Sequence, residues 1–404
     1  MKSLKFIHCA DLHLDSPFVG LKLPRRLHEL ARQSTFSSFT RIVNKAIEEE
    51  VDFLVIAGDL YDGEDRSIRA QIYFRNEMEK LAGKGIPVFI VHGNHDHLSG
   101  NWTKLKWPDN VFVFPGDVKM IPHCTKDGVR VHLYGFSYAK RHVRERMISH
   151  YRKEEGADFH IGILHGHDSK NGNHYSYAPF TVKELAGKGF DYWALGHIHQ
   201  RQVLKKDPLI IYPGNIQGRH RNETGEKGCY LIEMSEKETK ASFIETAPIR
   251  FERQKLDLEH GVKNFDDFYG EVMNVKDEWR QKGKHIILTL GLSGSDIDSS
   301  NMHWFETEEL LPLLNDGEEE QDPFVWIQDI DIDHNDTEQT SFNKGYFYKE
   351  LVTELERLDH LHEPLKDLFN HPRTKKYIDG LTTNEEKEIR EEAEKLLFRL
   401  LRKL

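Results

Sequence analysis

The stretch "VFIVHGNHDHLSG", residues 88–100, is a short apolar run that ends abruptly in polar side chains. The Val, Phe and Ile residues at 88–91 favour a buried strand. Gly93 is expected to let the backbone turn sharply where that strand ends. Asn94, His95 and Asp96 then place an amide, an imidazole and a carboxylate side by side. A cluster of this kind at the end of a strand raises the question of what it binds.

The same pattern, an apolar run followed by polar residues, recurs five more times in the first 250 residues. Segments between these runs, such as 32–50 and 67–85, have helical patterns. Strands that alternate with helices predict a layered α/β domain whose sheet is covered on both faces. In open α/β sheets, ligands bind beyond the carboxyl ends of the strands, which is where the polar clusters lie. The other runs end at Asp11-Leu12-His13, Asp59-Leu60-Tyr61-Asp62, His165-Gly166-His167, His197-Ile198-His199 and Asn215.

A different organisation follows residue 249. Residues 250–335 read as a compact β-α-β-α-β unit, which predicts a small second domain, with a helix expected over 303–316. Residues 336–345 are polar and are interpreted as a linker, and residues 346–404 have helical patterns. The last helix is expected to start at a capping box in 383–386.

Composition limits the class of protein. No run of about 18 apolar residues is present, so no membrane span is expected. Three cysteines without a CxxC spacing indicate a reduced, cytoplasmic protein. The net charge of −11 is unevenly distributed, because residues 1–250 hold 36 Lys and Arg against 31 Asp and Glu. The acidic excess of the rest therefore does not exclude a phosphate-rich substrate at the N-terminal domain.

Together the strand-end clusters offer carboxylate, imidazole and amide-oxygen groups. A mixed nitrogen and oxygen set suits Mn²⁺, Fe²⁺ or Zn²⁺. Any one of the 24 histidines could instead be an ordinary core or surface residue, so the prediction depends on the joint pattern. Seven ligands are too many for one ion but suffice for two that share a bridging carboxylate, as in sites that clamp a phosphoryl group. The candidate ligands are Asp11, His13, Asp59, Asn94, His165, His197 and His199.

The order of the motifs, DxH, GDxxD, GNHD, HG and GHxH, resembles that of the calcineurin-like metallophosphoesterase superfamily. The resemblance implies a four-layer α-β-β-α sandwich with a dinuclear metal centre. By analogy Asp11, His13, Asp59 and His199 bind one ion, and Asp59, Asn94, His165 and His197 bind the other, with Asp59 as the bridge. His95 would bind no metal but would protonate the leaving oxygen, and Asp96 would hold the His95 ring.

Several longer stretches resemble SbcD-type DNA repair nucleases, and the opening looks most like their bacterial YhaO-type branch. These stretches are "FIHCADLHLDSP", "GDLYDGEDRS", "YWALGHIHQRQVL" and "IIYPGNIQGRH". The resemblance implies a DNA exonuclease with added endonuclease activity, a DNA-contacting capping domain at 250–335, two Mn²⁺ ions and DNA repair. It also implies a coiled-coil ATPase partner, which would dock on the C-terminal helical region, and a homodimer. Asp62 departs from the pattern, since some of these nucleases have histidine there.

Further contacts to DNA are expected from basic and aromatic residues, although a solvated face or a packed loop is the more common explanation for each of them. Phosphate contacts would position a strand, and aromatic rings would stack on bases. The candidates are Arg141, Arg144, Arg219, His220, Tyr175 and Tyr177.

Two other functions remain open from the sequence. One is a phosphatase or cyclic-nucleotide phosphodiesterase on the same fold, which would not need the 250–335 unit. The other is a non-catalytic scaffold that binds DNA ends, which an intact set of ligands argues against.

Overall fold

The computed structural model describes residues 2–333 except 17, 19–20, 63–66, 101–102, 104, 170–176, 257–263, 294–303 and 306. It also describes seven residues between 350 and 393. The predicted linker and nearly all of the predicted C-terminal helical region therefore lie outside the described residues. None of the described helices combines the length and the apolar character needed to cross a membrane.

The first sheet is mostly parallel and has the strand order β12-β11-β1-β2-β3-β4. Its parallel strands β1 to β4 run side by side, and β11 pairs antiparallel with both β1 and β12. Strands β2 and β3 are buried along their whole length, as continuous apolar runs require. The strands are β1 (Ser3–Cys9), β2 (Phe53–Ala57), β3 (Val88–Val91), β4 (Val111–Val113), β11 (Gly228–Ser235) and β12 (Thr239–Glu245).

The second sheet has the order β5-β6-β7-β8-β10-β9. Strands β6, β7, β8 and β10 are parallel, and the edge strands β5 and β9 pair antiparallel with their neighbours. The strands are β5 (Lys119–Cys124), β6 (Arg130–Gly135), β7 (Phe159–His165), β8 (Tyr192–Gly196), β9 (Gln202–Lys206) and β10 (Leu209–Tyr212).

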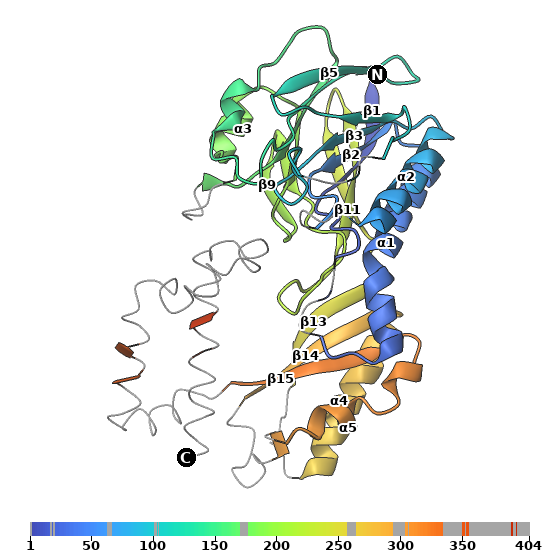
Figure 1. Ribbon diagram of the computed structural model, residues 1–404, viewed down its shortest axis with the longest axis vertical. Helices are drawn as coiled ribbons and strands as arrows, with labels where there is room; N and C mark the ends of the chain where they lie inside the picture. Colours follow the sequence, from blue (N-terminus) through green and yellow to red (C-terminus); the bar gives the residue numbers. More distant parts are fainter. Residues whose placement is uncertain are drawn as a thin grey trace.

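The two sheets pack face to face, and helices cover their outer faces (Figure 1). Between the sheets lies an aromatic and aliphatic core in which Phe6 and Phe53 stack at 4.9 Å. Helices α1 (Arg25–Glu48) and α2 (Ile68–Ala82) cover the first sheet. Helix α3 (Val182–Gly187) and the short 3-10 helix η1 (Met147–His150) cover the second. The predicted four-layer α-β-β-α sandwich is confirmed.

A third, all-parallel sheet with the order β13-β14-β15 forms a separate unit below the sandwich (Figure 1). Helices α4 and α5 pack on one face of this sheet. The other face packs against the start of α1, where Leu27 and Ala31 meet Phe251 and Ile287. The elements are β13 (Ile249–Lys255), α4 (Phe265–Gln281), β14 (His285–Ser293), α5 (Leu310–Leu314), the 3-10 helix η5 (Glu318–Glu320) and β15 (Val325–Asp333).

Helix α5 is shorter than the helix expected over residues 303–316. The backbone N–H of Thr307 bonds to the carbonyl of Trp304 in a separate turn, so the chain does not enter α5 as one continuous helix.

A buried ion pair holds α4 to η5 and β15. Lys276 Nζ lies 2.6 Å from Glu318 Oε2, and both side chains are almost fully buried. Lys276 also donates to the carbonyl of Leu314, and Glu318 accepts from the backbone N–H of Val325. Removing one member of such a pair leaves the other charge buried without its partner.

We therefore expect Glu318→Ala to lower the free energy of unfolding of the third-sheet unit by about 3–5 kcal/mol. Denaturant unfolding followed by tryptophan fluorescence measures this change. The exposed neighbour Glu320 offers the control, because Glu320→Ala should change stability by less than about 0.5 kcal/mol. Equal effects of the two substitutions would contradict the structural role of the ion pair.

Candidate metal centre

The candidate ligands lie at, or directly after, the carboxyl ends of five strands from both central sheets. Strands β1, β2 and β3 of the first sheet and β7 and β8 of the second bring their ends to one edge of the sandwich. The loops beyond these ends are the segments predicted to carry the site. The structure thus brings together all seven predicted ligands, which are Asp11, His13, Asp59, Asn94, His165, His197 and His199.

Four of these residues have left-handed backbone conformations. The φ angles are 52° at Asp11, 41° at His13, 50° at Asp59 and 102° at His197. Such conformations in residues other than glycine are costly and persist only where the surroundings enforce them. The backbone N–H groups of Asp11 and His13 donate to the carbonyls of Gly58 and Asp59, which ties the loop after β1 to the loop after β2. The strain therefore serves to turn the side chains inward directly at the strand ends.

The orientation of His165 is set by a backbone carbonyl. Its Nδ1 donates a hydrogen bond to the carbonyl of Ala57 at 2.9 Å, so in the neutral ring Nε2 carries a lone pair. That Nε2 lies 2.9 Å from Asn94 Oδ1 and 3.4 Å from Asp59 Oδ2, which are both acceptors. Asn94 Oδ1 also lies 3.2 Å from His197 Nδ1. Several electron-pair donors therefore converge on one point.

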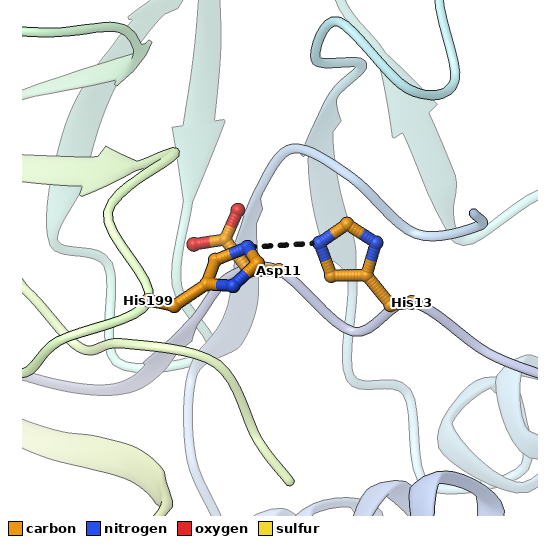
Figure 2. A group of neighbouring side chains, drawn as sticks. All are labelled: Asp11, His13 and His199. Atoms are coloured by element: carbon orange, nitrogen blue, oxygen red, sulfur yellow. Dashed lines mark hydrogen bonds between the residues drawn. The ribbon is translucent and has the colours of Figure 1, made fainter. Parts of the chain in front are cut away.

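A second convergence lies between His13 and His199, whose Nε2 atoms are 3.1 Å apart (Figure 2). His199 Nδ1 donates to Glu223 Oε1 at 2.6 Å, which leaves the lone pair on its Nε2. His13 Nδ1 lies 3.4 Å from Asp62 Oδ1, which favours a proton on that nitrogen and a lone pair on Nε2 as well. Asp11 completes this group, and its carboxylate also accepts from the backbone N–H of His197.

These contacts between acceptors are the arrangement that a divalent cation needs. Asp11, His13 and His199 form one group of potential ligand atoms, and Asp11, Asp59 and His165 form another. Asp59 lies between the groups, because its Oδ2 is 3.9 Å from His13 Nε2 and 3.4 Å from His165 Nε2. The residues present thus suit a dinuclear centre, and the donor set of carboxylate, imidazole and amide oxygen suits first-row divalent ions.

The pKa values of the buried groups also indicate a site that favours positive charge. Burial would raise the pKa of Asp59, but His165 and His95 hold it well below its usual range. Burial would lower the pKa of His165, but Asp59 and Asp11 raise it to about 9. Burial lowers the pKa of His13 to about 4, so this ring is a neutral ligand at physiological pH. A proton on His165 thus supplies charge that a metal ion would otherwise bring.

His95 lies beside the convergent ligands, and its ring is held by Asp62. His95 Nδ1 is 3.1 Å from Asp62 Oδ1, and the backbone N–H of His95 donates to Asp59 Oδ1 at 3.0 Å. Burial would lower the pKa of His95, but the charge of Asp59 and the hydrogen bond to Asp62 raise it. With Nδ1 committed to Asp62, Nε2 is the nitrogen left to act on a substrate.

The role predicted for Asp96 is therefore corrected. Its buried carboxylate accepts from the backbone N–H groups of Leu60 and Gly93, at 2.9 and 2.6 Å, and from His92 Nδ1 at 2.8 Å. Asp96 joins the loops after β2 and β3 from behind, and the carboxylate that hydrogen-bonds to the His95 ring belongs to Asp62. Neighbours in a tight turn point in different directions, which sequence adjacency does not reveal.

The reason for a glycine at position 93 also differs from the expectation. Gly93 is absent from the glycines with positive φ, so a sharp left-handed turn does not require it. A Cβ atom there would instead lie 2.3 Å from Asp59 Oδ1 and 2.6 Å from His165 Nε2. Gly93 is needed because two ligands cross directly over its backbone.

The predicted substrate contacts have varied positions. Arg219 lies against Asp62, and His220 is exposed with its Nε2 3.4 Å from Glu223 Oε1. The Tyr177 ring lies 5.0 Å from the His197 ring, at the border of the centre. Arg141 and Arg144 lie on the loop between β6 and η1, where Arg144 is exposed. Tyr175 lies outside the described residues, and a role in substrate binding remains a prediction for all six.

Two residues of the site escaped the sequence analysis. The sequence predicts no role for Asp62, although this residue stands in the polar cluster 59–62 and its place three residues after Asp59 was a usable signal. Glu223 accepts from His199 Nδ1, from Asn215 Nδ2 and from the backbone N–H of Arg219. It lies 24 residues from His199 in a loop without a recognisable motif, so nothing local indicated it.

Comparison with known proteins agrees with this geometry. Residues 4–201 match the family model described as calcineurin-like phosphoesterase. The chain is 38% identical to the uncharacterized metallophosphoesterase YhaO of Bacillus subtilis, with 100% of this chain and 99% of that protein covered. It is 25% identical to the DNA double-strand break repair protein Mre11 of Methanocaldococcus jannaschii, over 82% of this chain and 87% of that protein. A solved dimetal phosphatase from Danio rerio aligns with a TM-score of 0.34 and 11% identity, over 60% of this chain and 99% of that one, which is too remote to carry an argument.

We expect Gly93→Ala to weaken metal binding by roughly 10- to 100-fold, because the added methyl group must displace Asp59 or His165. Titration calorimetry with Mn²⁺ on the chelator-treated protein measures the affinity. Gly187→Ala is the matched control, since a Cβ at position 187 meets nothing within 4 Å. Unchanged affinity and stoichiometry in Gly93→Ala would contradict the proposed crossing of ligands.

Proposed function

Since the chain belongs to the calcineurin-like phosphoesterase family, we propose that it is a metal-dependent nuclease that hydrolyses phosphodiester bonds of DNA. The observation that carries the proposal is the position of His95. Its ring is fixed by Asp62 beside the convergent ligands, with Nε2 directed away from its partner. This arrangement suits the transfer of a proton to a leaving oxygen.

The seven ligand side chains would hold two divalent ions, for which we propose Mn²⁺, with Fe²⁺ or Zn²⁺ as alternatives. Bound there, the two ions would activate the attacking water and neutralise charge on the phosphoryl oxygens. The backbone strain and the hydrogen bonds described above keep the ligands in place before any ion arrives. Little reorganisation is then needed when substrate binds.

His95 supplies the proton that the departing oxygen needs. A raised pKa favours the protonated ring, and Asp62 holds Nδ1 so that the proton on Nε2 faces the substrate. Asp62 is thus a positioning residue and His95 the proposed general acid.

DNA as the substrate is supported by two observations. The third sheet packs on the start of α1 and so forms an additional unit beside the sandwich. The match to the archaeal repair protein covers 82% of this chain, so it extends beyond the two central sheets. We propose that residues 250–335 contact DNA and that the protein acts in DNA repair.

We further propose a cytoplasmic complex with a coiled-coil ATPase, bound through the C-terminal helical region, and a homodimer as the oligomeric state. These proposals rest on the resemblance to SbcD-type nucleases. Size-exclusion chromatography of the protein alone and with a coexpressed ATPase tests both.

The function itself is tested with labelled single-stranded DNA, duplex ends and bis(p-nitrophenyl) phosphate, each titrated with Mn²⁺. We expect cleavage of DNA with both metal positions filled. We expect His95→Asn to keep metal content and DNA affinity while cleavage falls by roughly 10²- to 10⁴-fold.

Cleavage of the small ester without any cleavage of DNA would reject the nuclease. DNA binding without hydrolysis of either substrate would favour a scaffold role. Normal cleavage by His95→Asn would remove His95 from the mechanism.

The dependence of activity on pH tests Asp62. Because the protonated ring is the active form, kcat/KM should fall as the pH rises through the pKa of His95. Asp62→Asn removes a contact that raises this pKa, so the falling limb should move to lower pH. Profiles of DNA cleavage, whose leaving alkoxide needs a proton, measure the shift, and an unmoved limb with a uniformly lower rate would show that Asp62 does not act through His95.

A further inference from the structure

Arg219 is held at two points by the groups that orient the centre. Its backbone N–H donates to Glu223 Oε2 at 2.7 Å, and Glu223 also orients His199. Its Nη1 donates to Ser16 Oγ at 2.8 Å and to Asp62 Oδ2 at 3.2 Å. The guanidinium is therefore fixed relative to both His199 and His95.

One end of this guanidinium has no partner among the described residues. Nη1 makes the two side-chain hydrogen bonds, and Nε is buried without a partner. Nη2 makes no hydrogen bond in the described part of the chain. The side chain of Arg219 is 15% exposed to solvent. An arginine that is anchored through Nη1 thus presents the donors of Nη2 to a ligand.

The position of this cation relative to His95 is set by a single carboxylate. Asp62 Oδ1 faces His95 Nδ1, and Asp62 Oδ2 faces Arg219 Nη1. The cation thus lies on the opposite oxygen of the carboxylate that faces the general acid. The next phosphate of a nucleotide chain lies one sugar away from the scissile phosphate.

We propose that Arg219 binds a second phosphate of the substrate, adjacent to the scissile one, and so selects nucleotide chains over simple phosphate esters. The inference rests on the proposed function, since it names the substrate feature that the same site recognises. Arginine suits the task because its charge is permanent and its donors are fixed in a plane. Anchoring by Asp62 and Ser16 means that little side-chain entropy is lost on binding.

The test compares three inhibitors of the hydrolysis of bis(p-nitrophenyl) phosphate by the full-length, Mn²⁺-loaded protein. These are adenosine 3′,5′-bisphosphate and the corresponding 5′- and 3′-monophosphates. In the wild type the bisphosphate should inhibit roughly 10- to 100-fold more tightly than the better monophosphate, as a charge-assisted contact predicts. In Arg219→Gln this ratio should fall to about twofold or less.

The control is Arg221→Gln, which makes the same change of charge on the same loop. Arg221 pairs with Asp329 of the third sheet, and its variant should keep the wild-type ratio. Arg219→Lys retains a cation next to Asp62 and serves as a second variant should the glutamine variant fold poorly. Its single ammonium is engaged by Asp62 and Ser16, so the ratio should fall here too.

A ratio near one in the wild type, or an unchanged ratio in both Arg219 variants, would overturn the proposal. Equal weakening of all three inhibitors would also overturn it, because Arg219 would then act only through Asp62 and His95. These results are separable from failure of the proposed function, since the nuclease assay uses DNA and this test does not. A protein that hydrolyses DNA but shows no dependence of the ratio on Arg219 would keep its function and lose this subsite.

Discussion

Imidazole nitrogens and side-chain oxygens, whose lone pairs cannot hydrogen-bond to one another, converge at one edge of the two central sheets. The rest of the structure depends on holding these acceptors together. His13 and His199 face each other through Nε2, and His165 Nε2 faces the oxygens of Asp59 and Asn94. His165 and His199 are each turned this way by an outer acceptor of a hydrogen bond from the other nitrogen, and Asp62 faces the other nitrogen of His13 at 3.4 Å. Such an arrangement is unfavourable unless a proton or a metal ion lies between the acceptors.

The fold supplies what this constraint requires. Parallel strands deliver their carboxyl ends to one edge, so short loops from two sheets meet there. Several ligands adopt left-handed backbone conformations directly after their strands, because a longer turn would carry the side chains past the centre. Glycines at 58, 93 and 196 leave the space through which His165 and its neighbours pass. Replacing any of these small residues would move a ligand without touching the metal directly.

Two carboxylates outside the seven predicted ligands position the other functional groups of the centre. Asp62 lies between His13, His95 and Arg219, and Glu223 joins His199 to the loop that carries Arg219. Burial opposes ionisation of both, yet their partners hold the pKa of each far below its usual range. They remain charged at any physiological pH and therefore act as fixed anchors. The proton-donating and cationic groups are thus positioned by the same framework as the ligands.

The sequence by itself determined the buried strands and the seven residues that meet at the centre, while the four-layer fold was implied by the resemblance of its motifs to a known family. The strands and the residues follow from local signals, since apolar runs specify buried strands and the polar groups directly after them must gather at one edge. Only the tertiary structure decided which carboxylate holds His95, where sequence adjacency favoured Asp96 and the fold selected Asp62. It also revealed Glu223 and the anchoring of Arg219, because those contacts join segments far apart in the chain. Side-chain direction in a tight turn and contact between distant loops depend on how the layers pack, and no periodicity in the sequence records that.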